Sequence, residues 1–212
     1  MRVLIACEYS GIVRDAFLDA GHVAVSCDVL PCESSREIPP HTPYNGHFQG
    51  DIFCLLDVDT EWDLMIAHPP CTHLSVSGAW CFTRKEGEPG FKPESLRTDA
   101  LQFVQDLMNV DIPRIAIENP VSVISSRIRK PNQYIQPYQF GHPEQKKTGL
   151  WLKNLPLLKE SNNVHDEMMK LDKKDREKIL NMSGKDRGKL RSRFYQGIAT
   201  AMAQQWGELN EN

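Results

Sequence analysis

The sequence predicts an α/β protein built on a mostly parallel sheet with helices on both faces. Two short apolar runs, at residues 2–7 (RVLIAC) and 22–27 (HVAVSC), have the length and composition of buried strands. Between them, residues 11–20 place apolar side chains at helical spacing, and Gly21 follows as a stop signal. A strand, a glycine turn, a helix and a second strand are the opening of a parallel α/β sheet.

Later segments extend this pattern. Residues 62–67 (WDLMIA) and 114–117 (RIAI) predict two further buried strands, and residues 94–109 predict a helix between them. Residues 134–140 and 148–152 predict later strands, whereas residues 162–206 are mostly helical in pattern with an interruption at Ser183-Gly184. Residues 31–50 and 72–93 predict long irregular segments.

Composition narrows the class of protein. The 212 residues are 40% hydrophobic and 25% charged, which is ordinary globular usage. No apolar run approaches the roughly 20 residues of a membrane span, and the first residues do not have the pattern of a signal peptide. The six cysteines contain no CxxC pair, which favours free thiols over disulfides or a metal site. We expect a cytoplasmic monomer with no membrane partner and no metal.

The charge is unevenly distributed. The net charge is -3, yet residues 170–193 carry ten Lys or Arg against four acidic residues. A basic block on an acidic body indicates a polyanionic partner such as a nucleic acid. A solvated helix face explains the same charges equally well, so both interpretations stay open at this point.

Polar residues follow the predicted parallel strands at the point where each strand ends. They are Glu8 to Gly11, Asp28, His68 to Cys71, and Glu118 to Pro120. Open α/β sheets bind their ligands at this edge. An acid at the end of the second strand, Asp28, suits a ribose diol, and Asp51 suits an adenine amino group, although either can be a simple turn residue. A GxGxxG dinucleotide fingerprint is absent.

Cys71 is the strongest candidate for a catalytic residue. It follows Pro69-Pro70, and two prolines fix the backbone at the strand exit. A thiol held in this way is a candidate nucleophile, provided that its site activates it. Glu118, in Glu118-Asn119-Pro120, places a carboxyl group at the next strand end. A thiol beside a carboxylic acid suits an electron-poor ring that is attacked and protonated together.

The order of these motifs resembles the DNA cytosine-5 methyltransferase family. It comprises Gly11, Asp28, Gly50-Asp51-Ile52, Pro69-Pro70-Cys71, Glu118-Asn119, Phe140-Gly141-His142-Pro143 and Gly197-Ile198-Ala199. The resemblance covers residues 2–206 and is closest to small members of phage and prophage genomes. It implies a Rossmann-like S-adenosylmethionine-dependent methyltransferase sheet with one active site.

The resemblance also implies roles for individual residues. Cys71 attacks carbon 6 of cytosine, Glu118 protonates or hydrogen-bonds ring nitrogen 3, and Asn119 orients the site. S-adenosyl-L-methionine is the implied cofactor, and Asp28 binds its ribose. The full set of implied cofactor-binding residues is Glu8, Ser10, Gly11, Asp28, Asp51, Ile52, Pro69, Gly197 and Ala199.

DNA is the implied partner, either as a base flipped out of a duplex or as a single strand. The expected DNA-binding residues are Ser75, Arg127, Arg129, Lys146, Lys147, Lys185, Lys189 and Arg191. Where the family has a glutamine and two arginines, this chain has Glu144, Lys146 and Thr148. We expect residues 72–93 to close over the base as a loop. The expected organisation is a catalytic core at 1–152, a short basic segment at 153–192 in place of a target-recognition domain, and a C-terminal helix at 193–212.

Three alternative functions remain from the sequence. Methylation of an exocyclic amine is disfavoured, because His68 and Cys71 occupy the places of the acidic or amide residue and the aromatic residue that such enzymes use. A related enzyme that modifies cytosine in a nucleotide, or that uses a modified S-adenosylmethionine, is compatible with the short segment between Leu152 and Tyr195. A non-catalytic DNA-binding protein that keeps the scaffold is the third alternative.

Overall fold

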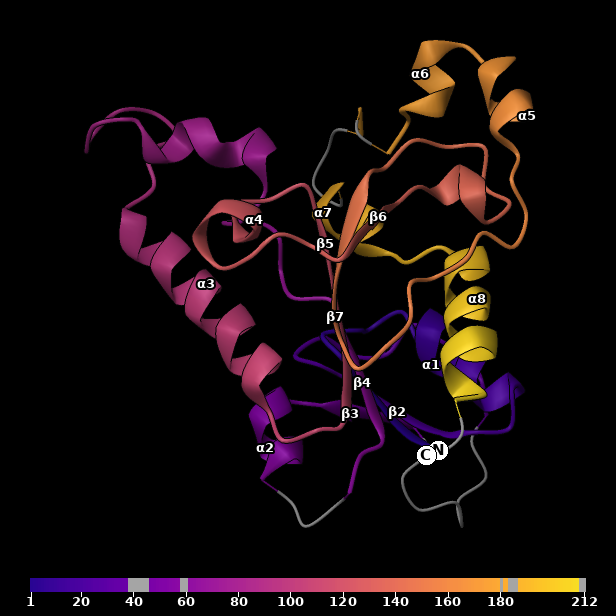
Figure 1. Ribbon diagram of the computed structural model, residues 1–212. Helices are drawn as coiled ribbons and strands as arrows, with labels where there is room; N and C mark the ends of the chain where they lie inside the picture. The colour runs from indigo at the N-terminus through magenta and orange to yellow at the C-terminus, as the bar shows by residue number, and fades with distance from the viewer. Residues whose placement is uncertain (38–45, 58–60, 180, 183–186, 210–212) are drawn as a thin grey trace.

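The computed structural model describes residues 1–37, 46–57, 61–179, 181–182 and 187–209. Within these residues, one sheet has the strand order β3-β2-β1-β4-β5-β7-β6 (Figure 1). Its strands are β1 (Arg2–Ala6), β2 (Val23–Asp28), β3 (Gly46–Gln49), β4 (Leu64–Ala67), β5 (Arg114–Pro120), β6 (Gln133–Ile135) and β7 (Thr148–Lys153). The first five are parallel, and β7 pairs antiparallel with both β5 and β6.

Helices cover both faces of the sheet (Figure 1). On one face α1 (Ile12–Asp19) packs beside α8 (Gln196–Gly207), and on the other lie α2 (Ile52–Leu56) and α3 (Glu94–Asn109). The shorter helical segments are η1 (Val76–Phe82), α4 (Ile124–Arg127), η2 (Pro137–Gln139), α5 (His165–Met169), α6 (Lys173–Arg176) and α7 (Arg187–Ser192).

Two hydrophobic clusters, one on each face, stabilise this arrangement. Along β1 the side chains alternate, so that Val3 and Ile5 join the cluster with α1 and α8 while Leu4 and Ala6 join the cluster with α3. All four are fully buried. Because both faces are covered, the central strands are apolar runs, which is why the sequence shows them clearly.

This sheet confirms the predicted fold class. The strand order changes direction between β1 and β4. The last strand of the chain, β7, lies next to β5 in the sheet and is antiparallel to it. This is a Rossmann-like α/β sheet with one antiparallel strand between β5 and β6. The carboxyl ends of β1, β2, β4 and β5 therefore meet at one edge of the sheet, where such folds bind ligands.

Several expectations about individual segments were wrong. The predicted loop at 31–50 contains the edge strand β3, which pairs with β2. The predicted strand at 134–140 ends at Ile135, because Pro137 begins η2. The predicted helical region at 162–206 contains α5, α6, α7 and α8, and its expected interruption at Ser183-Gly184 lies outside the described residues. The irregular segment 72–93 contains η1.

None of the helices in the described part of the chain is both long enough and apolar enough to cross a membrane.

Candidate active site

The segment after β4 holds Cys71 in a defined place. The amide of His68 donates to Ala6 O at 2.9 Å, and the carbonyl of Pro69 accepts from Asn119 Nδ2 at 2.9 Å. The carbonyl of Cys71 accepts from the amides of Leu74 and Ser75 at 3.1 and 2.9 Å. The backbone is thus fixed on both sides of Cys71, while the residue itself is exposed. A substrate can reach this thiol.

Glu118 lies beside the strand that carries Cys71. The register pairs Ala67 with Ile117, so the residues that follow, His68 and Glu118, are neighbours across the sheet. Glu118 is buried, and its Oε2 lies 3.2 Å from His68 Nδ1. Unlike the predicted strand end, β5 continues through Glu118 and Asn119 to Pro120, because β7 pairs with it along this length.

The surroundings of Glu118 favour its ionised form. Burial raises its pKa, but the hydrogen bond from His68 and the positive charge of Lys146 outweigh burial, so the pKa lies below the usual value of a glutamate. The carboxylate can then only accept hydrogen bonds, which places the proton of the His68–Glu118 hydrogen bond on Nδ1. Glu118 is an ionised carboxylate at neutral pH.

The surroundings of Cys71 favour the protonated form of its thiol. Desolvation by the surrounding protein raises the pKa of its thiol, and the charge of Glu118 raises it further. Lys146 and Arg191 act against this shift. At neutral pH the thiol is therefore protonated, and the pair formed by Cys71 and Glu118 holds one proton, which is on the sulfur.

Lys146 reaches this pair from the segment between β6 and β7. Its Nζ donates to Arg191 O at 3.0 Å, and its amide donates to Gln136 Oε1 at 3.0 Å. Thr148 lies beside the carboxyl of Glu118, and its hydroxyl donates to Lys146 O at 3.1 Å. Two of the three positions that depart from the family pattern therefore lie at the candidate catalytic pair.

His68 is a site residue to which the sequence analysis gave no role. The ring of Phe194 packs 4.6 Å from it between centroids. Its Nε2 is buried and has no hydrogen-bond partner among the described residues. The available signal was the register of two neighbouring parallel strands, which brings the residue before Pro69 next to Glu118.

The turn between β1 and α1 is built by Glu8, Ser10 and Gly11. The carboxylate of Glu8 accepts from the amides of Val13 and Arg14 at 2.7 and 3.2 Å and from Ser10 Oγ at 3.1 Å. It therefore caps the N-terminus of α1. Gly11 has a φ of 75°, and a Cβ there would meet Ser34 Cβ at 2.7 Å. The local role of these residues is to shape this turn, and their contact with a cofactor stays a prediction.

Two carboxylates lie at the ends of β2 and β3. Asp28 Oδ1 accepts from the amide of Leu30 at 2.9 Å, and Asp51 caps α2 by accepting from the amide of Phe53 at 3.0 Å. Desolvation followed by the charges of both aspartates raises the pKa of the buried Cys27 to about 12. Asp28 and Asp51 are thus close enough to act on one thiol.

This part of the edge fits an adenosine. Val29, Leu30 and Phe48 next to Asp28 are 71%, 44% and 38% exposed, which is unusual for large apolar side chains and suits an aromatic ring. Asp28 can accept from a ribose hydroxyl. Ile52, in contrast, is buried in the cluster with α3.

Gly197 and Ala199 attach α8 to the rest of the fold. The amide of Gly197 donates to His142 Nε2 at 2.9 Å, and a Cβ on Gly197 would lie 1.8 Å from Phe140 O. Ala199 is fully buried. Both residues have a packing role, and their place at a cofactor stays a prediction, as does that of Pro69.

The expected DNA-binding residues belong to several segments of the chain, and their contact with DNA stays a prediction. Arg191 lies near Cys71, and Ser75 Oγ is 2.9 Å from Ser77 Oγ in the same turn. Arg129 donates to Asn132 Oδ1 at 2.8 Å and to Leu152 O at 3.2 Å, so its guanidinium is held by hydrogen bonds within the protein.

The remaining basic residues are placed as follows. Arg127 is exposed and pairs with Glu94 at 3.5 Å, and Lys147 Nζ lies 4.4 Å from the centroid of the Tyr134 ring. Lys185 and the side chain of Lys189 lie outside the described part of the chain.

All six cysteines are free thiols. In the described residues, no three His, Cys, Asp or Glu side chains are grouped so that they could hold a metal ion.

Comparison with known proteins gives only distant similarities. No family model and no curated protein matches the chain. Among solved structures, it is similar to a putative DNA modification methyltransferase encoded within a prophage (E. coli), with a TM-score of 0.42 and 13% identity over 72% of this chain and 46% of that one. It is also similar to an rRNA methylase from Escherichia coli, with a TM-score of 0.39 and 12% identity over 72% and 56%. The chain spans about half the length of each. Both scores are low, so the fold assignment rests on the strand order of the sheet.

Proposed function

We propose that this protein transfers a methyl group from S-adenosyl-L-methionine to the 5-position of cytosine in DNA through a covalent adduct with Cys71. The observation that carries the proposal is the exposed residue Cys71 at the carboxyl edge of a Rossmann-like sheet, with its thiol close enough to the buried carboxylate of Glu118 to feel its charge. The order of motifs that resembles the cytosine-5 family supports the same reaction.

In this proposal, the cofactor binds at one half of the carboxyl edge of the sheet and the base binds at the other half. The apolar side chains around Asp28, at the end of β2, suit the adenosine part of the cofactor. Cys71 and Glu118, at the ends of β4 and β5, suit the base. S-adenosyl-L-methionine supplies an electrophilic methyl group. Because the strand order reverses between β1 and β4, the two sites adjoin at the switch point.

The protonation of the pair agrees with this chemistry. The Cys71 sulfur forms a bond to carbon 6 of cytosine as the thiol loses its proton and ring nitrogen 3 gains one, with the Glu118 carboxylate accepting the N3–H hydrogen bond. Carbon 5 of the ring, now an enamine, takes the methyl group. S-adenosylhomocysteine is the leaving group of that transfer. Loss of the proton on carbon 5 to solvent then breaks the bond between sulfur and carbon 6, and the proton on nitrogen 3 returns to the departing thiolate, which restores the thiol and releases 5-methylcytosine.

The neighbouring residues position these two groups. Asn119 ties β5 to Pro69 through its 2.9 Å hydrogen bond and so fixes the separation of the thiol and the carboxylate. His68 holds one oxygen of Glu118, and Lys146 favours both the thiolate and the carboxylate. A base inside a duplex cannot reach Cys71, so the target is a flipped or single-stranded cytosine.

Covalent trapping tests the proposal. DNA that contains 5-fluorocytosine cannot lose fluorine from carbon 5, so the enzyme should stay bonded to it when S-adenosyl-L-methionine is present. Denaturing electrophoresis and mass spectrometry should show this adduct on Cys71 in the wild type and in Cys81→Ala, and no adduct in Cys71→Ala. Trapping by 5-fluorodeoxycytidine triphosphate but by no DNA would favour the nucleotide-modifying enzyme. Absence of any adduct, together with DNA binding, would favour a non-catalytic protein.

A further inference from the structure

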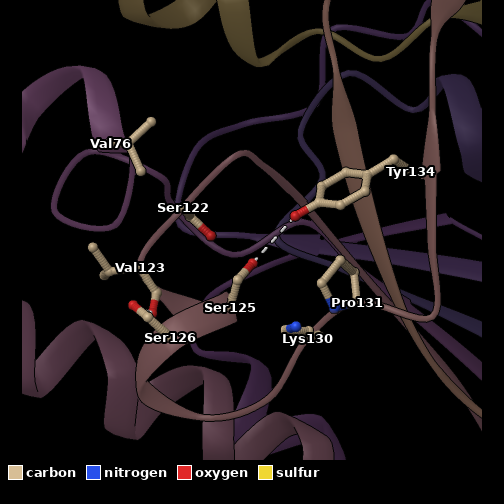
Figure 2. Close-up of a pocket in the computed structure, with 8 residues that line it drawn as sticks. All are labelled: Val76, Ser122, Val123, Ser125, Ser126, Lys130, Pro131 and Tyr134. Carbon is tan, nitrogen blue, oxygen red and sulfur yellow. Dashed lines mark hydrogen bonds between the residues drawn. The ribbon is translucent and has the colours of Figure 1, made fainter.

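A cavity of about 530 Å³ lies beside the candidate active site and plays no part in the mechanism above (Figure 2). It opens between η1, α4 and β6. The chain that leaves Cys71 forms one wall, because Ser75 pairs with Ser122 as an isolated bridge and the amide of Val76 donates to Val121 O at 3.2 Å. The cavity is therefore fixed to the segment that carries the nucleophile.

Hydroxyl groups line the cavity. Ser122, Ser125 and Ser126 come from the turn that begins α4, and Tyr134 comes from β6. Figure 2 shows the hydroxyls of Ser125 and Tyr134 directed toward each other, 3.4 Å apart. Ser122 is only 3% exposed, and its hydroxyl has no hydrogen-bond partner among the described residues. Ser126 Oγ donates to Val123 O at 3.1 Å, so a ligand with a donor or an acceptor would satisfy chiefly the hydroxyl of Ser122.

An aromatic ring and cations complete the cavity. Tyr134 is 40% exposed, which leaves its ring available for stacking, and Lys147 Nζ lies 4.4 Å from its centroid. Lys130 lines the cavity, and no acidic side chain from the described part of the chain does. An exposed aromatic ring with nearby cations is the arrangement on which single-stranded nucleic acids stack their bases.

We propose that this cavity binds the base of a nucleotide adjacent to the target cytosine, stacked on Tyr134 and hydrogen-bonded to the serine hydroxyls. The proposal rests on the proposed function, because the neighbouring base is defined by the cytosine at Cys71. Lys130 and Lys147 contact the phosphates on either side of this base. The enzyme then prefers a particular base at a single flanking position, because the remaining contacts to phosphates carry no sequence information.

Abasic scanning of a single-stranded oligonucleotide tests this. Fluorescence anisotropy measures the affinity of the wild type for a strand with one cytosine and for strands with an abasic site at each flanking position. One position should lose about 5- to 150-fold in affinity, which is the usual contribution of one stacked base. Tyr134→Ala should lose the same factor on the intact strand and lose nothing more at that abasic position. Tyr134→Phe keeps the ring and should stay within about twofold of the wild type.

The control is Tyr138→Ala, since Tyr138 packs against His165, 5.2 Å away between ring centroids, and lines no part of the cavity. It should leave the affinity unchanged. Additive losses for Tyr134→Ala and every abasic position would overturn the cavity proposal while leaving the methyl transfer intact. A wild-type protein that forms the 5-fluorocytosine adduct but shows no flanking position with a loss would do the same. A wild-type protein that binds neither this oligonucleotide nor its duplex would overturn both proposals.

Discussion

Replacing Gly197 with alanine should destabilise the fold, because the first turn of α8 has no room for a side chain. An added Cβ would lie 1.8 Å from Phe140 O and 3.1 Å from His142 Nε2. The closer atom belongs to the backbone, so α8 itself must move, and α8 is packed against α1 and the sheet. Overpacking of this kind costs about 2–3 kcal/mol. For a chain of this length, that loss lowers Tm by about 4–12 °C.

Thermal unfolding followed by circular dichroism measures this shift, with Gly188→Ala as the matched control. A Cβ on Gly188 meets nothing within 4 Å, and Gly188 lies in α7, so the control should be neutral or slightly stabilising. Titration calorimetry on both variants reports the binding of S-adenosyl-L-methionine separately. If Gly197→Ala keeps the wild-type Tm but loses cofactor affinity, the packing argument is wrong and the glycine serves the cofactor.

Three further predictions concern charges at the site. Asp28→Ala should weaken S-adenosyl-L-methionine by about ten- to a hundredfold in calorimetry, because it removes a charged acceptor for the ribose; unchanged affinity would make Asp28 a turn residue only. Burial lowers the pKa of His142, whose neutral ring accepts from Gly197, so stability should fall as the pH drops from 7 to 5, through and below the ordinary value of about 6.5. His142→Gln should show a smaller fall in Tm over that range, and an equal fall would contradict the assignment. The charge of Lys146 lowers the pKa of the Cys71 thiol, so Lys146→Met should shift the pH profile of Cys71 alkylation by iodoacetamide to higher pH. Lys146→Arg keeps the charge and should stay close to the wild type. Identical pH profiles for Lys146→Met and the wild type would refute this prediction.

The central sheet could be predicted from the sequence because its strands are buried on both faces and read as apolar runs. The edge strand β3 could not, because its residues are half-buried or exposed and pair only with β2. The predicted strand from 134 failed at Pro137, where a capping box between Gln136 and Gln139 starts η2 instead. Here a local hydrogen-bond pattern decided the structure, and the β-propensity of the neighbouring residues did not.

In the candidate site, too, some features could be predicted from the sequence and others could not. The sequence was sufficient to place Cys71 and Glu118 near each other, because parallel strands bring their carboxyl ends to one edge. It was not sufficient to place Lys146 or Arg191 beside the pair, because both reach it through tertiary packing. For Glu8, the sequence showed only that a carboxylate follows β1. It did not show that this carboxylate caps α1, because the cap depends on how the turn at Gly11 folds.

The role of the lysine at 146 in the proposed reaction is best understood through the proton that the Cys71 sulfur carries beside the ionised Glu118. Attack on cytosine needs that proton to leave the sulfur, so the site must favour a thiolate without providing a second proton. Lys146 does this as a point charge that acts on both groups, since it lowers the pKa of each. An arginine would form a bidentate pair with the carboxylate and hold it more rigidly. The backbone carbonyl of Arg191, 3.0 Å from Lys146 Nζ, instead holds the ammonium by a hydrogen bond to α7. In the proposed mechanism, the thiol stays protonated until a base arrives that can accept the proton at nitrogen 3, and only then does it become a nucleophile.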